Sequence, residues 1–125
     1  MPKVLLIEDE APIRTTLARF LKMEGFEVVT AADGAQGVAA AQSELPDVIV
    51  CDLLMPELDG YQVLSALRSD PRTARIPFLL LTASAAPEEQ AAGIGRGAAA
   101  FLTKPFHLDD VRAAIMRFVA PPGDA

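Results

Sequence analysis

Apolar residues are arranged along this chain in two alternating patterns, short continuous runs and spacings typical of a helix. The continuous runs predict buried strands, because a strand covered on both faces carries few polar side chains. Strands are expected at about Val4–Ile7, Glu27–Ala31, Asp47–Cys51, Phe78–Leu81 and Ala100–Leu102. Since the runs alternate with segments of helical spacing, the pattern predicts an α/β fold with a parallel sheet.

The helical segments have recognisable starts and stops. The first helix is expected to begin near Pro12, because proline suits the first turn, and to stop at Gly25. Its apolar residues fall on one face, which should dock on the sheet. Further helices are expected at about Ala35–Gln42, Gly60–Ser69 and Leu108–Val119.

The fourth helix should lie within the segment 87–100, but this segment contains three glycines. Gly93, Gly95 and Gly97 would each cost roughly 0.8–1 kcal/mol relative to alanine inside a helix. The sequence therefore predicts one of two outcomes: the helix ends early, near Ala92, or it is poorly held.

Composition limits the class of protein. The 125 residues suit one domain with a well-buried core. A composition with 51% hydrophobic residues, 22% charged residues and a net charge of -6 is typical of a soluble globular protein. The negative charge disfavours nonspecific binding to nucleic acids or anionic membranes. Residues 1–120 should form the domain, and the Pro-Pro-Gly segment within 121–125 indicates a C-terminal tail or the start of a linker.

The expected compartment is the cytoplasm. The single cysteine, Cys51, lies inside an apolar run and has no partner for an internal disulfide, so a buried thiol in a reducing compartment is expected. Only four consecutive apolar residues precede the first acids. This run is too short for a signal peptide or a membrane span.

Acidic side chains follow two of the predicted strands. The run Val4–Ile7 ends in Glu8, Asp9 and Glu10, and the third run ends in Asp52. If the two strands are neighbours, their carboxylates converge on one crevice at the carboxyl edge of the sheet. One such cluster alone could merely cap a helix. Several anions at one place favour a hard divalent metal with oxygen ligands, and Mg²⁺ is the natural candidate.

Two further polar side chains follow the last two strands. Thr82 comes after the fourth run and Lys104 after the fifth. Taken singly, such a threonine usually caps a turn and such a lysine is usually a solvated charge. In an open α/β sheet, however, ligands bind outside the carboxyl ends of the strands. The joint occurrence of Thr82 and Lys104 with Asp52 therefore indicates a functional site.

Four stretches, taken together and in order, carry a resemblance to a known family. They are Ile7-Glu8-Asp9-Glu10, the segment from Asp52 to Gly60, Leu81-Thr82-Ala83, and Gly97-Ala98 with the segment from Phe101 to Phe106. Over residues 3–119 the chain resembles a receiver domain of the bacterial two-component response regulators, of the chemotaxis-regulator type. The resemblance implies a flavodoxin-like, doubly wound parallel sheet of five strands in the order 2-1-3-4-5, with five helices.

The resemblance also implies a phosphoacceptor signalling domain rather than an enzyme. Asp52 would accept a phosphoryl group from a phosphohistidine on a sensor histidine kinase or a phosphotransfer protein. Asp9 would bind Mg²⁺ directly and Glu8 through water. Asp52 and the backbone carbonyl of Leu54 would complete the protein's ligands.

The remaining implied roles concern the phosphoryl group and the output. Lys104 would pair with one phosphoryl oxygen and Thr82 would donate its hydroxyl to another. The Lys104-Pro105 peptide would be cis. Thr82 and Phe101 would act as a switch that remodels the face formed by the fourth helix, fifth strand and fifth helix, where a downstream protein or an output domain binds. Direct binding to nucleic acid or to a membrane is not expected.

Three rival classes are less consistent with these residues. A phosphatase of the haloacid dehalogenase type would need a second aspartate two residues after Asp52, where Leu54 stands. In a flavodoxin the acids after the first strand would oppose the phosphate of the flavin. An interaction module that has lost phosphorylation would not need the acids together with Thr82 and Lys104.

Overall fold

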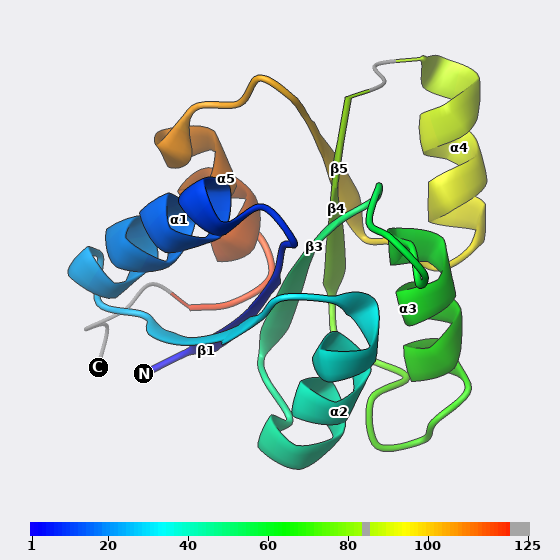
Figure 1. Ribbon diagram of the computed structural model, residues 1–125, viewed down its shortest axis with the longest axis horizontal. Helices are drawn as coiled ribbons and strands as arrows, with labels where there is room; N and C mark the ends of the chain where they lie inside the picture. The colour runs from blue at the N-terminus through cyan, green and yellow to red at the C-terminus, as the bar shows by residue number, and fades with distance from the viewer. Residues whose placement is uncertain (84–85, 121–125) are drawn as a thin grey trace.

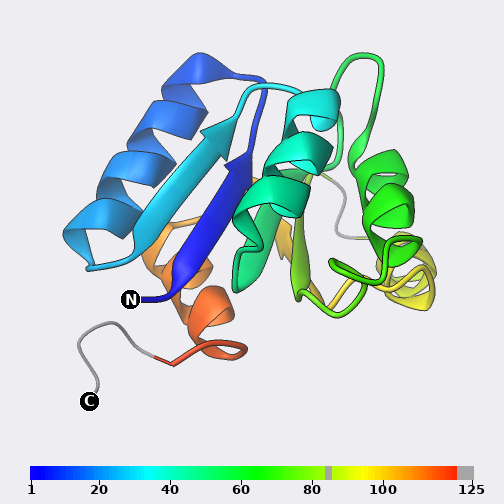
Figure 2. The same cartoon turned by 90° about the horizontal axis from the view of Figure 1, so that it is seen from below.

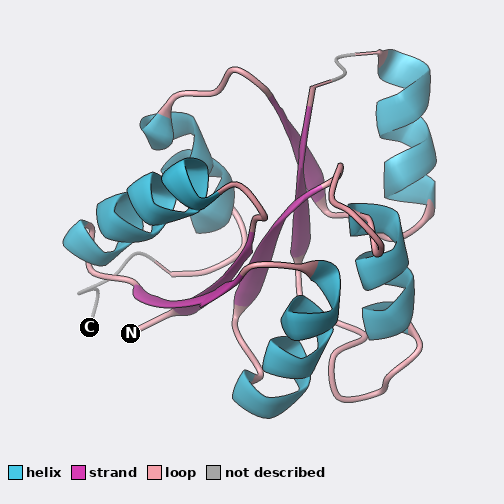
Figure 3. Cartoon of the chain, in the orientation of Figure 1, coloured by secondary structure: helices cyan, strands magenta, loops and turns pink. Residues whose placement is uncertain are grey.

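A single parallel sheet forms the centre of the molecule (Figures 1 and 3). In the computed structural model, which describes residues 1–83 and 86–120, the strands run in the order β2-β1-β3-β4-β5. The strands are β1 (Lys3–Ile7), β2 (Glu27–Ala31), β3 (Val48–Asp52), β4 (Phe78–Thr82) and β5 (Ala100–Thr103). This arrangement confirms the predicted flavodoxin-like fold and its strand order.

Helices cover both faces of the sheet, as Figure 2 shows. They are α1 (Ala11–Met23), α2 (Gly34–Glu44), α3 (Gly60–Arg68), α4 (Pro87–Gly95) and α5 (Leu108–Met116). One face packs against α1 and α5, and the other against α2 and α3, with α4 beside α3. Within the described residues, no helix is long and apolar enough to cross a membrane.

Strand β1 explains why the central strands read as continuous apolar runs. Val4 and Leu6 belong to the apolar layer under α1 and α5, whereas Leu5 and Ile7 belong to the layer under α2 and α3. Side chains alternate across a strand, so a strand buried on both faces must be apolar at every position. Cys51 on β3 is fully buried, which confirms the expected buried thiol, and burial raises the pKa of this thiol.

Two helix boundaries follow local sequence signals. After α1, Gly25 adopts a φ of 97°, a left-handed conformation that favours glycine. Before α3, the Asp59 side chain accepts a hydrogen bond of 2.9 Å from the backbone N–H of Gln62. The Gln62 side chain in turn accepts one of 2.9 Å from the backbone N–H of Asp59. This reciprocal pair is a capping box.

Helix α4 is longer than the early-ending alternative predicted. It continues to Gly95, so the expected end near Ala92 is wrong. A local reason is visible at Gly93, where a side chain would collide with the Phe101 ring; this close packing offsets the low helix propensity of glycine. Gly93 is nevertheless the only buried residue of α4. The other alternative, a poorly held helix, stays a prediction.

Other boundaries differ from expectation by one to three residues. Strand β3 runs one residue further than predicted, because Asp52 still pairs with Leu81 of β4. Helix α5 ends at Met116, before the expected Val119, although the N–H of Val119 still donates to the carbonyl of Ile115. The predicted tail or linker at 121–125 lies outside the described residues.

The two ends of the described chain lie together at the amino edge of the sheet. Met1 and Pro2 line the same surface pocket as Phe118, Val119 and Ala120. The polar residues singled out from the sequence are at the opposite edge, where the strands end.

Candidate functional site

Three carboxylates meet where β1 and β3 end. The two strands are neighbours, with Ile7 in register with Cys51. Glu8 and Asp9 directly follow β1, and Asp52 is the last residue of β3. Ligand oxygens of the three side chains all lie within 4.8 Å of one another. The convergence expected from the strand ends is therefore present.

Burial makes this acidic cluster unusual. Glu8 is 0% exposed and Asp52 only 3%. Among the described residues, both carboxylate oxygens of Glu8 and Oδ1 of Asp9 are buried without a hydrogen-bond partner. Leaving such an acceptor unsatisfied costs about 1–3 kcal/mol, and more when it is charged. Unpartnered carboxylate oxygens at this spacing fit a hard divalent cation such as Mg²⁺.

Lys104 supplies the positive charge at this edge. Its Nζ lies 3.1 Å from Oδ1 of Asp52 and 3.6 Å from Oε1 of Glu8. Partial burial would lower the pKa of Lys104, but the hydrogen bond to Asp52 and the surrounding carboxylates outweigh burial and raise it. The ammonium is thus held in its charged form. The Lys104–Pro105 peptide is cis, the isomer that the resemblance implies.

One ammonium does not neutralise the cluster. Burial raises the pKa of Glu8, and the adjacent Asp52 carboxylate raises it further, to about 8, although Lys104 acts in the opposite direction. Around neutral pH a proton on Glu8 is therefore favoured, and a cation placed at this position would compete with that proton.

Thr82 and Phe101 lie on the neighbouring strands β4 and β5. Thr82 is buried at the end of β4 and is in register with Thr103, while Phe101 is in register with Leu80. Because side chains alternate along a strand, Thr82 and Phe101 face the same side of the sheet. The ring of Phe101 packs against the apolar layer under α2 and α3. Leu54, two residues past the end of β3, leaves its side chain 70% exposed.

Arg14 is a site residue that the sequence did not single out for this position. From α1 its Nη1 donates a hydrogen bond of 2.8 Å to the backbone carbonyl of Glu8 and a longer one of 3.5 Å to that of Asp9. It thereby fixes the loop that carries both acids. A cation near the start of a helix opposes the helix dipole, and that local conflict is the sequence signal that points to a special role.

A family model described as the response regulator receiver domain matches residues 4–116. The DNA-binding dual master transcriptional regulator RpaA of Synechocystis is 40% identical over 115 residues, which are 92% of this chain and 48% of that protein. The transcriptional regulatory protein PrrA of Mycobacterium bovis is 39% identical, with 91% of this chain and 48% of that protein covered. The chain thus spans about half the length of these curated relatives.

Solved structures agree with the sequence relatives. The chemotaxis response regulator CheY4 of Vibrio cholerae superposes with a TM-score of 0.90 at 35% identity, covering 95% of this chain and 99% of that chain. The receiver domain of a sensor histidine kinase of Pseudomonas aeruginosa superposes with a TM-score of 0.85 at 30% identity, covering 94% and 96%. That structure is described as having a magnesium ion coordinated in the active site cleft.

Proposed function

Because the chain belongs to the receiver domain family of two-component response regulators, we propose that Asp52 is its phosphoacceptor. The donor is a phosphohistidine on a sensor histidine kinase or a phosphotransfer protein. The observation that carries the proposal is the placement of Asp52 at a strand end, 3% exposed, between the acids that follow β1 and the ammonium of Lys104. The domain acts in signalling, and it assists only its own phosphorylation and dephosphorylation.

The side chains of the site divide the work of phosphoryl transfer. A carboxylate oxygen of Asp52 attacks the phosphorus, the phosphorus–nitrogen bond of the donor breaks, and its electron pair returns to the imidazole. Lys104, 3.1 Å from Oδ1 of Asp52, pairs with an oxygen of the transferred group, and Thr82 donates its hydroxyl to another. The transfer needs charge stabilisation more than covalent assistance.

Mg²⁺ is the proposed cofactor. The buried oxygens of Glu8 and Asp9 that lack a hydrogen-bond partner support it, as does the magnesium ion named for the Pseudomonas relative. Asp9 would bind the ion directly and Glu8 through water, with Asp52 and the backbone carbonyl of Leu54 as further ligands. When bound, the ion offsets the negative charge of the phosphoryl oxygens.

The donor protein has a suitable surface beside the site. An apolar groove of about 620 Å³ lies between the start of α1 and the segment after β5, and residues lining it include Ile13, Phe106 and Lys104. Lys104 joins this groove to the acidic cluster. A helix of a kinase or phosphotransfer protein that fills the groove would bring its phosphohistidine to Asp52.

The output surface is the face formed by α4, β5 and α5. Thr82 and Phe101 lie on the same side of neighbouring strands, which supports a switch that links the phosphoryl group to this face. A downstream protein, or an output domain following residues 1–120 and the segment 121–125, is the proposed partner. The net charge of -6 argues against direct contact of this domain with nucleic acid or an anionic membrane.

Intact mass measurement after incubation with acetyl phosphate tests the assignment. Wild-type protein with Mg²⁺ should gain one phosphoryl group, whereas Asp52→Ala should gain none and EDTA should suppress the reaction. Asp109→Asn, which changes an exposed acid of α5, serves as the matched control and should react like wild type. Phosphate on Asp52→Ala, or full reaction in EDTA, would contradict the proposal.

A further inference from the structure

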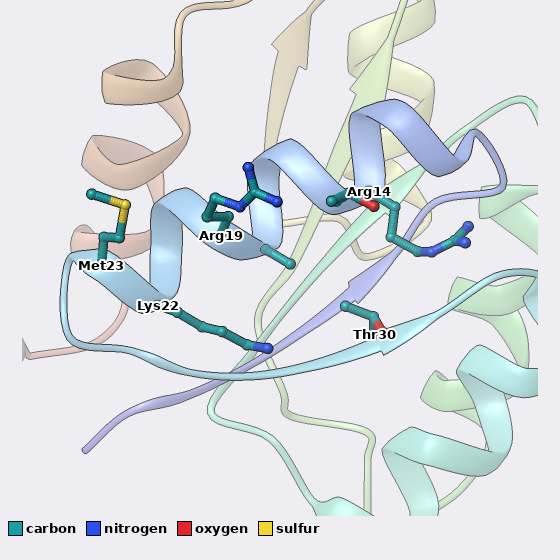
Figure 4. Close-up of a pocket in the computed structure, with 7 residues that line it drawn as sticks. Arg14, Arg19, Lys22, Met23 and Thr30 are labelled. Carbon is teal, nitrogen blue, oxygen red and sulfur yellow. The ribbon is translucent and has the colours of Figure 1, made fainter.

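A groove between α1 and β2 is lined by several basic side chains, although the protein as a whole is acidic. Its volume is about 540 Å³, and its lining residues are Arg14, Thr15, Ala18, Arg19, Lys22, Met23 and Thr30. Figure 4 shows the long side chains of α1 beside Thr30 of β2. The chain has 17 acidic and 11 basic residues, yet within the part of the chain that the structure describes no acidic side chain lines this groove. The local charge is therefore opposite to that of the whole molecule.

These cations are not neutralised within the protein. Among the ion pairs of the described residues, none involves Arg14, Arg19 or Lys22. Glu27, the acid of β2, is paired with Lys3 at 3.5 Å. One nitrogen of Arg14 is held by the carbonyl of Glu8, which fixes its guanidinium in place. The groove therefore presents an uncompensated positive field to solvent.

The dimensions of the groove match an extended polypeptide. Arg14 and Lys22 are eight positions apart on one helix, which corresponds to about 12 Å along its axis. The first and fifth residues of an extended chain are about 13 Å apart, with alternate side chains on one face. Thr30 lies along β2 between the side chains of Arg14 and Lys22 (Figure 4). Strand β2 is at the edge of the sheet, where backbone groups are open to a further strand.

We propose that this groove binds an acidic, extended segment of a partner protein, whose alternate carboxylates pair with Arg14, Arg19 and Lys22. The hydroxyls of Thr15 and Thr30 and the open edge of β2 add hydrogen-bonding groups suited to a polypeptide. A long polyanion such as nucleic acid would extend past the groove. There it would be repelled by the rest of the protein, because the net charge of the chain is -6. The groove contains none of the three acids of the cluster and meets their loop only through Arg14, which holds the carbonyl of Glu8. Binding of the segment therefore does not require phosphorylation of Asp52.

Titration with a short acidic peptide tests the proposal on the whole unphosphorylated chain. The probe is Glu-Ser-Glu-Ser-Glu with both ends blocked, and its counterpart has glutamine in place of each glutamate. Followed by ¹H–¹⁵N NMR at low ionic strength, the acidic probe should saturate, shift amides of α1 and Thr30, and bind more weakly as salt is added. Absence of saturable binding, or equal binding of the glutamine peptide, overturns the proposal.

Charge reversal with a matched control locates the binding. The double variant Arg19→Glu/Lys22→Glu should weaken binding by roughly tenfold. The double variant Arg75→Glu/Arg117→Glu makes the same change in net charge at exposed positions outside the groove and should stay within about twofold of wild type. Dispersed NMR spectra establish that each variant is folded. If both double variants lose the same affinity for the acidic peptide, net charge alone explains the loss, and the proposal is overturned.

A single-stranded DNA oligonucleotide of the same charge tests the class of partner. The oligonucleotide should bind more weakly than the acidic peptide. If it binds more tightly and loses affinity in Arg19→Glu/Lys22→Glu, the groove recognises nucleic acid and the proposed occupant is wrong.

Discussion

At the scale of the residue, the surroundings of Glu8 are unfavourable for its own negative charge. It is fully buried and its pKa is raised to about 8, whereas an unfolded glutamate titrates near its ordinary value of 4.5. Between those values the folded chain keeps a proton that the unfolded chain releases. The free energy of unfolding contributed by Glu8 is therefore fully present below about pH 4.5 and is lost as the pH rises towards 8.

The first prediction follows from this proton. Since Mg²⁺ must displace it, the affinity for Mg²⁺ should rise with pH, by up to about tenfold per unit, and level off near pH 8. Isothermal titration calorimetry between pH 5.5 and 8.5 measures the affinity. The control is Glu8→Gln, whose affinity should depend much less on pH. A wild-type affinity that stays constant over this range contradicts the prediction.

Lys104 gives the second prediction. Replacing it with alanine removes the cation that competes with a metal for Asp52 and Glu8, so Lys104→Ala should bind Mg²⁺ about two- to tenfold more tightly. The same variant should respond weakly to beryllofluoride, a phosphoryl mimic, because no ammonium pairs with it. Lys22→Ala, an exposed lysine of α1, is the control. An unchanged beryllofluoride response would count against the proposed role of Lys104.

At the scale of the element, α4 offers two glycines with opposite surroundings, and these give the third prediction. A Cβ at Gly93 would lie 2.0 Å from Cζ of Phe101, whereas a Cβ at Gly95 would meet nothing within 4 Å. Gly93→Ala should therefore destabilise the fold by about 1–3 kcal/mol through overpacking. Gly95→Ala should stabilise it by about 0.5–1 kcal/mol through helix propensity.

Urea denaturation of both variants measures the two effects under the same conditions. A double variant in which Phe101→Leu accompanies Gly93→Ala should recover part of the lost stability, because the smaller side chain makes room for the added methyl group. If both single substitutions change the free energy of unfolding in the same direction, the contact between Gly93 and Phe101 does not determine the packing of α4.

Strands and site residues could be predicted from the sequence better than the end of α4 could. Apolar runs located all five strands. In β1, β3 and β4 the runs are continuous because both faces of these strands are covered, whereas β2 and β5 are only partly buried. Strand-end polarity located Glu8, Asp9 and Asp52. The end of α4 was missed because the sequence does not show that Gly93 packs against Phe101. That contact exists only once α4 is packed against β5. The contact of Arg14 with the carbonyl of Glu8 was missed because its acceptor is a backbone group. The residue types can mark Arg14 as unusual near the start of α1 but cannot identify that partner.

At the scale of the whole molecule, the acidic cluster and α4 should be coupled, and this is the fourth prediction. Tyr61 of α3 contacts α4 and the residue that follows it. The Tyr61 hydroxyl donates a hydrogen bond of 3.5 Å to the carbonyl of Glu89, and the ring lies 4.6 Å from the guanidinium of Arg96. With Gly93 as the only buried residue of α4, the helix should open at low free energy. A phosphoryl group on Asp52 would then shift a broad ensemble towards an ordered one.

Hydrogen exchange detects this coupling. Amides from Glu88 to Arg96 should exchange quickly in the free protein and slowly when beryllofluoride and Mg²⁺ are added, while α1 serves as the internal reference. If these amides are already as protected as those of α1, the helix is rigid and the ordering mechanism is wrong.

The shared pocket of Met1, Pro2 and residues 118–120 bears on how such a domain is used in larger proteins. Both ends of the described chain emerge at the edge of the sheet opposite Asp52, so sequence joined at either end leaves the approach to that aspartate open. Gene fusion at either end would thus need no redesign of the chemistry. The same domain can be fused before or after unrelated domains, and its binding surfaces can change while the edge of the sheet that carries Asp52 stays the same.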